Sequence, residues 1–133
     1  MLRIEPIGIA LKKLEKLTEL FEQLLNVPCY KTEEVASEGV KTAFFQTGES
    51  KIELLEASAE TSPIQKFIDK KGEGIHRIAF EVENIEAEMK RLAALGFELL
   101  NTEPKKGADN KLVCFLHPKT TNSVLVELCQ EIR

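Results

Sequence analysis

The stretch Gly74-Ile75-His76-Arg77-Ile78-Ala79-Phe80-Glu81-Val82 decides the fold, because an earlier stretch repeats its pattern. It begins on a glycine, carries β-branched and aromatic residues at alternate positions, and ends just before a helix start at Asn84. This period of two predicts a β-strand. Near the N-terminus, Ile4-Glu5-Pro6-Ile7-Gly8-Ile9-Ala10-Leu11 has the same form. Aligning the two strands places Pro6 opposite Arg77.

The repetition continues beyond these two strands. Each strand is followed by an amphipathic helix pattern, by extended segments and by a closing strand, at 51–56 in the first copy and 124–129 in the second. Glu53 and Glu127 take equivalent places in the closing strands. Two long copies exclude a solenoid. We therefore predict an α+β fold in which two βαβββ modules form an open, cupped mixed sheet, with the helices around 12–26 and 84–95 on its outside.

We expect a single domain over residues 1–133, because no linker or low-complexity segment separates the two copies. Ser62 and Pro63 mark the start of a helix between them, with Gln65 at the capping-box position. In the second copy, Phe97–Asn101 is expected as a strand and Glu103–Asn110 as a polar loop. The predicted parts are module one at 1–57, a connector helix at 58–73 and module two at 74–133.

Composition and charge exclude several functional classes. The net charge of −4 provides no basic surface, so we expect no nucleic-acid partner. No apolar run approaches the roughly 20 residues that span a bilayer, and the N-terminus lacks the apolar stretch of a signal peptide. The three cysteines are odd in number and show no CxxC spacing, which favours reduced core thiols and a cytoplasmic protein.

The candidate chemistry lies in the two equivalent glutamates. Glu53 and Glu127 each occupy a strand interior, where an unpaired buried carboxylate would cost several kcal/mol. If both side chains point inward, they require a cation, which could be a metal ion or a basic side chain. If both point to solvent, they carry no chemistry, and the sequence alone leaves this alternative open. The small residues Gly8, Ala10 and Ala79 indicate either room for a ligand or close packing.

The duplicated βαβββ pattern resembles the vicinal oxygen chelate superfamily, which includes glyoxalases, bleomycin-resistance proteins and extradiol dioxygenases. Within it, the chain is most similar to methylmalonyl-CoA epimerases along its whole length. The motifs that carry this resemblance are Ile7-Gly8-Ile9-Ala10, Lys51-Ile52-Glu53-Leu54-Leu55-Glu56, Ser62-Pro63-Ile64, Gly72-Glu73-Gly74-Ile75-His76, Ile78-Ala79-Phe80, Phe115-Leu116-His117-Pro118-Lys119 and Val124-Leu125-Val126-Glu127-Leu128.

The resemblance implies a mechanism in which a divalent metal, held by two histidines and two Glu or Gln residues, binds the substrate and stabilises an enolate. The carboxylate ligand positions correspond to Glu53 and Glu127, whereas the histidine positions correspond to Pro6 and Arg77. Proline offers no ligand and arginine carries a permanent positive charge. We therefore expect no cofactor, and a divalent metal such as cobalt or magnesium only if the two carboxylates still hold it.

Two functional hypotheses follow from the resemblance. In the first, the protein is an epimerase in which Arg77 replaces the metal and bridges Glu53 and Glu127, the candidates for proton transfer. In the second, it is a metal-free, non-catalytic binding protein of the glyoxalase fold for an acyl-CoA or another small anion. The resemblance also implies that His117 and Lys119 bind the substrate, with Lys119 meeting a CoA phosphate, and that the protein forms a homodimer.

Overall fold

A computed structural model describes residues 1–132 and divides into two compact units. The first unit comprises Pro6–His76. The second comprises Met1–Glu5 together with the residues from Arg77 onward. Two strands therefore contribute residues to both units, β1 (Arg3–Leu11) and β5 (Gly74–Glu81).

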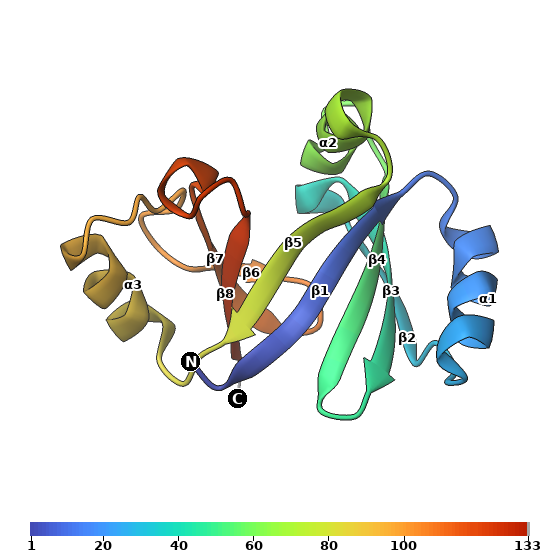
Figure 1. Cartoon of the computed structure of the whole chain (residues 1–133), viewed down its shortest axis with the longest axis horizontal. Coiled ribbons are helices and arrows are strands. Elements are labelled where there is room, and N and C mark those ends of the chain that lie inside the picture. The colour runs from blue at the N-terminus through green and yellow to red at the C-terminus, as the bar shows by residue number, and fades with distance from the viewer. Residues whose placement is uncertain (133) are drawn as a thin grey trace. The chain divides into compact units, whose positions relative to one another are not determined.

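The first unit contains one copy of the predicted βαβββ pattern (Figure 1). Its strands run in the order β2-β3-β4-β1, with β1 parallel to β4 and the other neighbours antiparallel. A 3-10 helix at Ala36–Glu38 joins β2 to β3. The remaining elements are α1 (Leu14–Leu25), β2 (Lys31–Val35), β3 (Val40–Thr47), β4 (Ser50–Ala57) and α2 (Pro63–Lys71).

The second unit repeats this arrangement. Its strands run in the order β5-β8-β7-β6, and β5 is parallel to β8 just as β1 is parallel to β4. Its other elements are α3 (Ile85–Ala94), β6 (Lys105–Gly107), β7 (Lys111–Leu116), a 3-10 helix at Pro118–Thr120, and β8 (Val126–Glu131). The predicted α+β class and its two βαβββ modules are thus confirmed.

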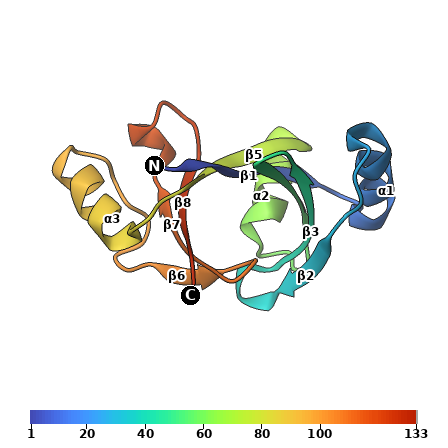
Figure 2. The same ribbon diagram turned by 90° about the horizontal axis from the view of Figure 1, so that it is seen from below.

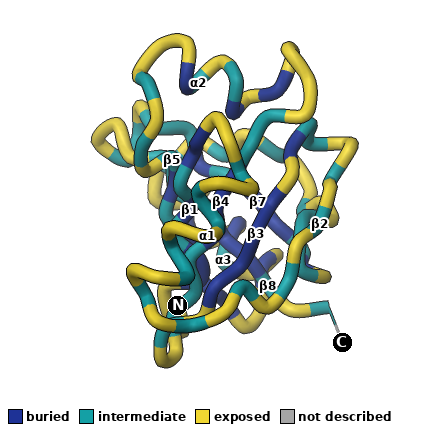
Figure 3. Tube along the Cα trace, turned by 90° about the vertical axis from the view of Figure 1, so that its right-hand side faces the viewer, coloured by how far each residue is buried: buried dark blue, intermediate teal, exposed yellow. Residues whose placement is uncertain are grey.

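In the first unit, the two helices lie on opposite faces of the strands (Figure 2). α1 packs Leu17 and Phe21 against Phe45 and Leu54. The same cluster includes Ile9 and Leu11 near the end of β1. α2 packs Ile64 and Ile68 against the other face, near Leu55. The middle of β3 is buried between these layers (Figure 3). The face that carries Leu55 also carries Glu53, because side chains alternate along a strand.

In the second unit, one face of the strands is apolar and covered by α3. Ile85, Met89 and Leu92 of this helix pack on Cys114 and Leu128. Successive side chains of a strand point to opposite faces, so the odd-numbered residues of β7 and β8 lie on the face away from α3. That second face contains most of the unit's buried charged side chains.

The two helix starts that the sequence predicts have the expected capping bonds. Ser62 accepts a hydrogen bond from the Ile64 amide, and Asn84 accepts one from the Ala87 amide. Gln65, however, donates to Asp69 one turn further on. Ser62 therefore caps α2 through the N2 amide, whereas the predicted capping box would use the N3 amide of Gln65.

Two elements of the second unit differ from the prediction. Residues 97–101, predicted as a strand, form only an isolated bridge between Leu99 and Leu116. The predicted polar loop instead contains β6, which pairs with β7 in antiparallel register. The connection is tight because Asp109 and Asn110 adopt left-handed backbone angles, with φ of 57° and 54°.

None of the helices in the described part of the chain has the length and apolar character needed to cross a membrane.

Candidate functional site

A buried ion pair joins Arg77 of β5 to Glu127 of β8 within the second unit. The guanidinium Nε donates to the Glu127 Oε1. The two residues are only 8% and 5% exposed. Ala79 is the direct neighbour of Glu127 in the parallel ladder, and Phe115 is its neighbour on β7. The charged pair therefore lies beside a small methyl group on one strand and an aromatic ring on another.

The physical effect of this pair is charge compensation. A carboxylate removed from water requires a cation and several hydrogen bonds, and a guanidinium supplies both. The pair confirms one half of the expectation that Arg77 bridges two glutamates. The other half, which concerns Glu53, stays a prediction, and so do the catalytic roles of all three residues.

Glu53 belongs to the first unit. It lies in the middle of β4, with Gly8 of β1 and Phe44 of β3 as its ladder neighbours. It is 2% exposed and points to the face away from α1. The alternative that this glutamate faces solvent is therefore wrong. Glu127 is only 5% exposed, so the same alternative is wrong for the second copy.

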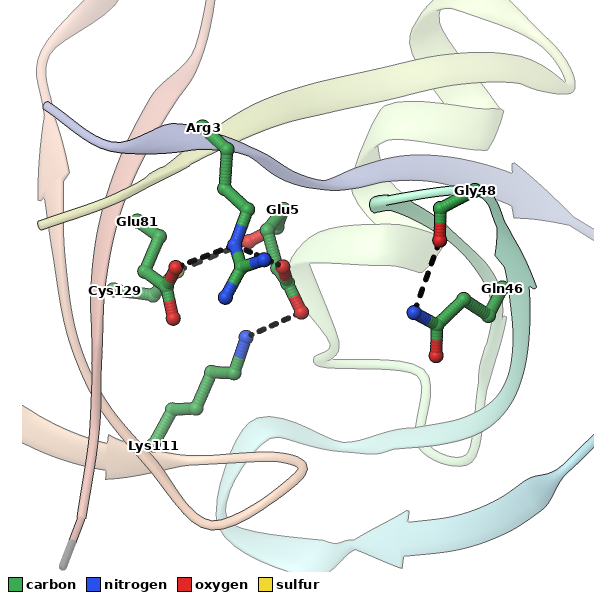
Figure 4. A network of polar contacts seen from close by, with 7 residues as sticks. All are labelled: Arg3, Glu5, Gln46, Gly48, Glu81, Lys111 and Cys129. Carbon is green, nitrogen blue, oxygen red and sulfur yellow. Dashed lines mark hydrogen bonds and ion pairs between the residues drawn. The ribbon is translucent and has the colours of Figure 1, made fainter.

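Figure 4 shows a second group of charged residues, which comprises Arg3, Glu5, Glu81 and Lys111. Glu81 and Lys111 lie on the same face of the second unit as Glu127, because side chains alternate along each strand. The Lys111 Nζ is 3.3 Å from Glu5 Oε1, and the Arg3 Nε is 3.1 Å from Glu5 Oε2. Arg3 also donates to Glu81 Oε2 at 2.6 Å. Two acids and two bases thus compensate each other in one network.

Cys129 connects this network to the Arg77–Glu127 pair. It follows Glu127 by two residues on β8, so both side chains lie on one face. Its thiol donates to the Glu5 carbonyl oxygen over 3.0 Å. Burial raises the pKa of the Cys129 thiol to about 12, while the nearby Lys111 ammonium opposes that shift. The thiol is a neutral hydrogen-bond donor and an unreactive nucleophile at neutral pH.

The sequence pattern did not single out the residues of this network. Period-two alternation would group Glu5 with Ile7 and Ile9, yet Glu5 pairs with Lys111 whereas Ile9 packs near α1. One signal was available for Glu81, because it follows Arg77 by four residues and must share its face. Lys111 offered no comparable signal, since it stands at the end of a strand where exposure is the usual expectation.

His117 and Lys119, the predicted substrate-binding residues, lie at the end of β7 in the 3-10 turn. The His117 Nδ1 accepts a hydrogen bond from the Lys119 amide at 3.0 Å. The Lys119 ammonium is 2.9 Å from Glu98 Oε1, and hydrogen bonding to it lowers the pKa of Glu98. Both side chains are partly exposed, so their substrate-binding role stays a prediction.

Comparison with known proteins assigns the family. Residues 6–115 match the Glyoxalase/Bleomycin resistance protein/Dioxygenase superfamily. The chain belongs to this superfamily. As a member, it is 36% identical to the uncharacterized protein YqjC of Bacillus subtilis, over 98% of this chain and 93% of that protein.

Other superfamily members with similar sequences carry a described activity. The chain is 39% identical to an ethylmalonyl-CoA/methylmalonyl-CoA epimerase of Cereibacter sphaeroides, over 96% of this chain and 97% of that protein. It also resembles a structure of a Streptomyces coelicolor methylmalonyl-CoA epimerase variant in complex with 2-nitronate-propionyl-CoA. That match has a TM-score of 0.94 and 32% identity, and covers 100% of this chain and 99% of the other.

Proposed function

We propose that the protein is an epimerase that moves the α-proton of an acyl-CoA such as methylmalonyl-CoA through an enolate. The observation that carries this proposal is the buried Arg77–Glu127 pair, which places a permanent cation beside a carboxylate in a member of this superfamily. Sequence similarity to two named epimerases supports the choice of substrate class.

The residues at the positions of the family's metal ligands do not fit a divalent ion. By the resemblance, the two histidine positions fall on Pro6, which offers no donor atom, and on Arg77, whose guanidinium already binds Glu127. In residues 1–132, no three His, Cys, Asp or Glu side chains are grouped to hold a metal. The proposed reaction therefore uses no metal ion.

In the proposed reaction, the Glu127 carboxylate removes the proton from the α-carbon of the thioester. The electron pair of the broken C–H bond moves onto the thioester oxygen, which becomes an enolate oxygen. Arg77 donates hydrogen bonds to that developing negative charge, because its guanidinium carries a permanent positive charge and N–H donors. Return of a proton to the opposite side of the α-carbon gives the epimer.

Three further residues complete the proposal. Glu53 is the second candidate for proton transfer, since it is a buried carboxylate at the equivalent place in the first copy of the repeat. His117 and Lys119 are the candidates for binding the CoA portion. Lys119 carries a charge that attracts phosphate, and the ion pair to Glu98 is exposed and therefore readily exchanged.

The alternative function is a non-catalytic binding protein for an acyl-CoA or another small anion. The same ion pair favours it, because a carboxylate already engaged by a guanidinium can be a structural partner rather than a base. The two functions differ in one observable. Both predict binding of an acyl-CoA, but only the epimerase exchanges the α-proton.

The experiment that tests this proposal measures epimerisation and exchange of the α-proton together. Purified protein is incubated in deuterated buffer with (2R)- or (2S)-methylmalonyl-CoA, and the α-deuterium content and the epimer ratio are measured. We expect both epimers to gain deuterium and to interconvert, and the Glu127→Gln variant to lose this activity by at least about 100-fold. Tight binding of the CoA ester without any exchange would support the binding protein instead.

A further inference from the structure

The turn that follows β7 holds two side chains, His117 and Lys119, around a carboxylate of the same unit, that of Glu98. We propose that the Glu98 carboxylate occupies the place of a CoA phosphate group at this turn, so that Glu98 competes with the ligand and lowers its affinity. This inference rests on the part of the proposed function that assigns His117 and Lys119 to the CoA portion. It adds a residue, Glu98, to which neither the repeat nor the family resemblance gives a role.

The two side chains of the turn face different oxygen atoms of the same carboxylate. The Lys119 Nζ is 2.9 Å from Glu98 Oε1, and the His117 Nε2 is 3.9 Å from Glu98 Oε2. A phosphate group likewise presents several acceptor oxygens on one central atom, and a lysine ammonium is a common partner for it. The pair of side chains that now meets a carboxylate is therefore also suited to a phosphate.

The backbone of the turn determines which nitrogen of His117 is the donor. The His117 Nδ1 accepts a hydrogen bond from the Lys119 amide at 3.0 Å. Because Nδ1 is an acceptor, the neutral imidazole carries its proton on Nε2, the nitrogen that faces Glu98. His117 thus offers an N–H donor to an anion at this place even when the ring is uncharged.

The backbone of Glu98 is held by contacts that do not involve its carboxylate. Its amide donates to the Thr120 Oγ1 at 3.1 Å, and its carbonyl oxygen accepts from the His117 amide at 2.8 Å. The next residue, Leu99, forms a bridge with Leu116 of β7. The Glu98 side chain can therefore leave Lys119 while the turn keeps its shape, and a substitution at this side chain spares the fold.

Electrostatics favours replacement of the carboxylate by a phosphate. The hydrogen bond from Lys119 lowers the pKa of Glu98, so the carboxylate is ionised at neutral pH. Both side chains are exposed, and an exposed ion pair is held only weakly. A phosphate group carries more negative charge than a carboxylate and has more acceptor oxygens, so it can displace Glu98 from the ammonium. The same carboxylate opposes its approach until it is displaced.

The test uses the Glu98→Gln variant, which keeps the size of the side chain and removes its charge. The dissociation constant of coenzyme A is measured by isothermal titration calorimetry at neutral pH and low ionic strength. The matched control is Glu88→Gln, which removes the carboxylate of another exposed ion pair of the second unit, the pair with Arg91. We expect Glu98→Gln to bind coenzyme A about two- to fivefold more tightly than the wild type, and the control to match the wild type.

A further pair of variants shows whether the gain depends on Lys119. In Lys119→Ala the ammonium for which the two anions compete is absent. Adding Glu98→Gln to this variant should therefore change the affinity for coenzyme A much less than the same change in the wild type. An equal gain in both backgrounds would mean that Glu98 acts through the net charge of the protein alone, and would overturn the proposed competition.

Coenzyme A contains two kinds of phosphate, and dephospho-coenzyme A distinguishes them because it lacks the 3′-phosphate and keeps the diphosphate. A gain seen only with coenzyme A supports the inference and assigns the turn to the 3′-phosphate. A gain shared by both ligands supports it and assigns the turn to the diphosphate. Unchanged or weaker binding of both ligands by Glu98→Gln would overturn it.

The outcome is separable from that of the proposed catalysis, which is measured by exchange of the α-proton. A wild type that exchanges no proton, beside a Glu98→Gln variant with increased affinity, would refute the epimerase function and support the inference. Proton exchange by the wild type without any gain in affinity in the variant would do the reverse.

Discussion

Arg77 and Glu127 are ion-paired although they are not direct partners in the parallel β5–β8 ladder, where Ala79 faces Glu127. The Arg77 guanidinium reaches along β5 to the level of Ala79, two residues further on. This diagonal contact leaves the position directly beside the carboxylate to a methyl group. Ala79 is itself fully buried in a cluster with Val113 and Cys129, so a larger side chain at position 79 would have to displace those neighbours.

The stability of the second unit should depend strongly on this pair. Replacement of Arg77 by Ala leaves the Glu127 carboxylate buried without its guanidinium, and we expect a loss of about 3–5 kcal/mol in the free energy of unfolding. Urea unfolding followed by circular dichroism measures this loss. The control is Arg91→Ala, which removes an exposed ion pair with Glu88 and should cost at most about 1 kcal/mol. Equal losses in the two variants would contradict the burial argument.

Stability should also respond to alkaline pH through Cys129. Its folded-state pKa of about 12 lies above the ordinary value of 9.0. Below pH 9 the thiol is neutral in both states and its contribution is fully present. Between these two values only the unfolded chain ionises, so stability falls by about 1.4 kcal/mol per pH unit. Unfolding curves of the wild type and Cys129→Ala at increasing pH should converge, and parallel curves would refute this account.

The turn after β7 should contribute to substrate binding rather than to the chemical step. Lys119→Ala removes a charge that we expect to meet a CoA phosphate, so KM should rise several-fold with kcat little changed. Lys90→Ala, on α3, serves as the control for a general change in surface charge. A fall in kcat at constant KM would show that Lys119 acts elsewhere in the reaction.

The purified protein should contain no stoichiometric transition metal. Pro6 offers no ligand atom and Arg77 is engaged with Glu127, so the expected donor set is incomplete. Elemental analysis after exhaustive dialysis measures this directly. Near-equimolar cobalt, zinc or nickel that survives dialysis would mean that the ligands lie elsewhere in the chain.

Much of the fold could be predicted from sequence because its signal is periodic. The duplicated strand–helix pattern located both βαβββ modules, and alternation along β4 and β8 identified two glutamates that the structure buries. The short strand β6 escaped prediction because its lysines and glycine carry no apolar alternation. It exists through pairing with β7, where Gly107 lies so close to Val113 that an added Cβ would come within 3.0 Å of the valine side chain.

The Glu5–Lys111 network could not be predicted for a different reason. A prediction from alternation assumes that all residues on one face of a strand pack against the same neighbours. This does not hold for β1, which is divided between the two units. Its residues up to Glu5 belong to the second unit and those from Pro6 onward to the first, so Glu5 and Pro6 are both buried although they are adjacent. Only the three-dimensional pairing reveals that Glu5 meets a lysine more than 100 positions away.

The central claim, that a guanidinium replaces the metal ion in an active epimerase, is tested most directly by α-deuterium incorporation in the presence of a chelator. Wild-type protein is dialysed against EDTA and given methylmalonyl-CoA in deuterated buffer, with and without added cobalt, beside an Arg77→Met variant treated identically. We expect the wild type to incorporate deuterium at the same rate in both conditions and the variant to lose that rate. Incorporation that appears only when cobalt is added, or that persists without Arg77, would contradict the claim.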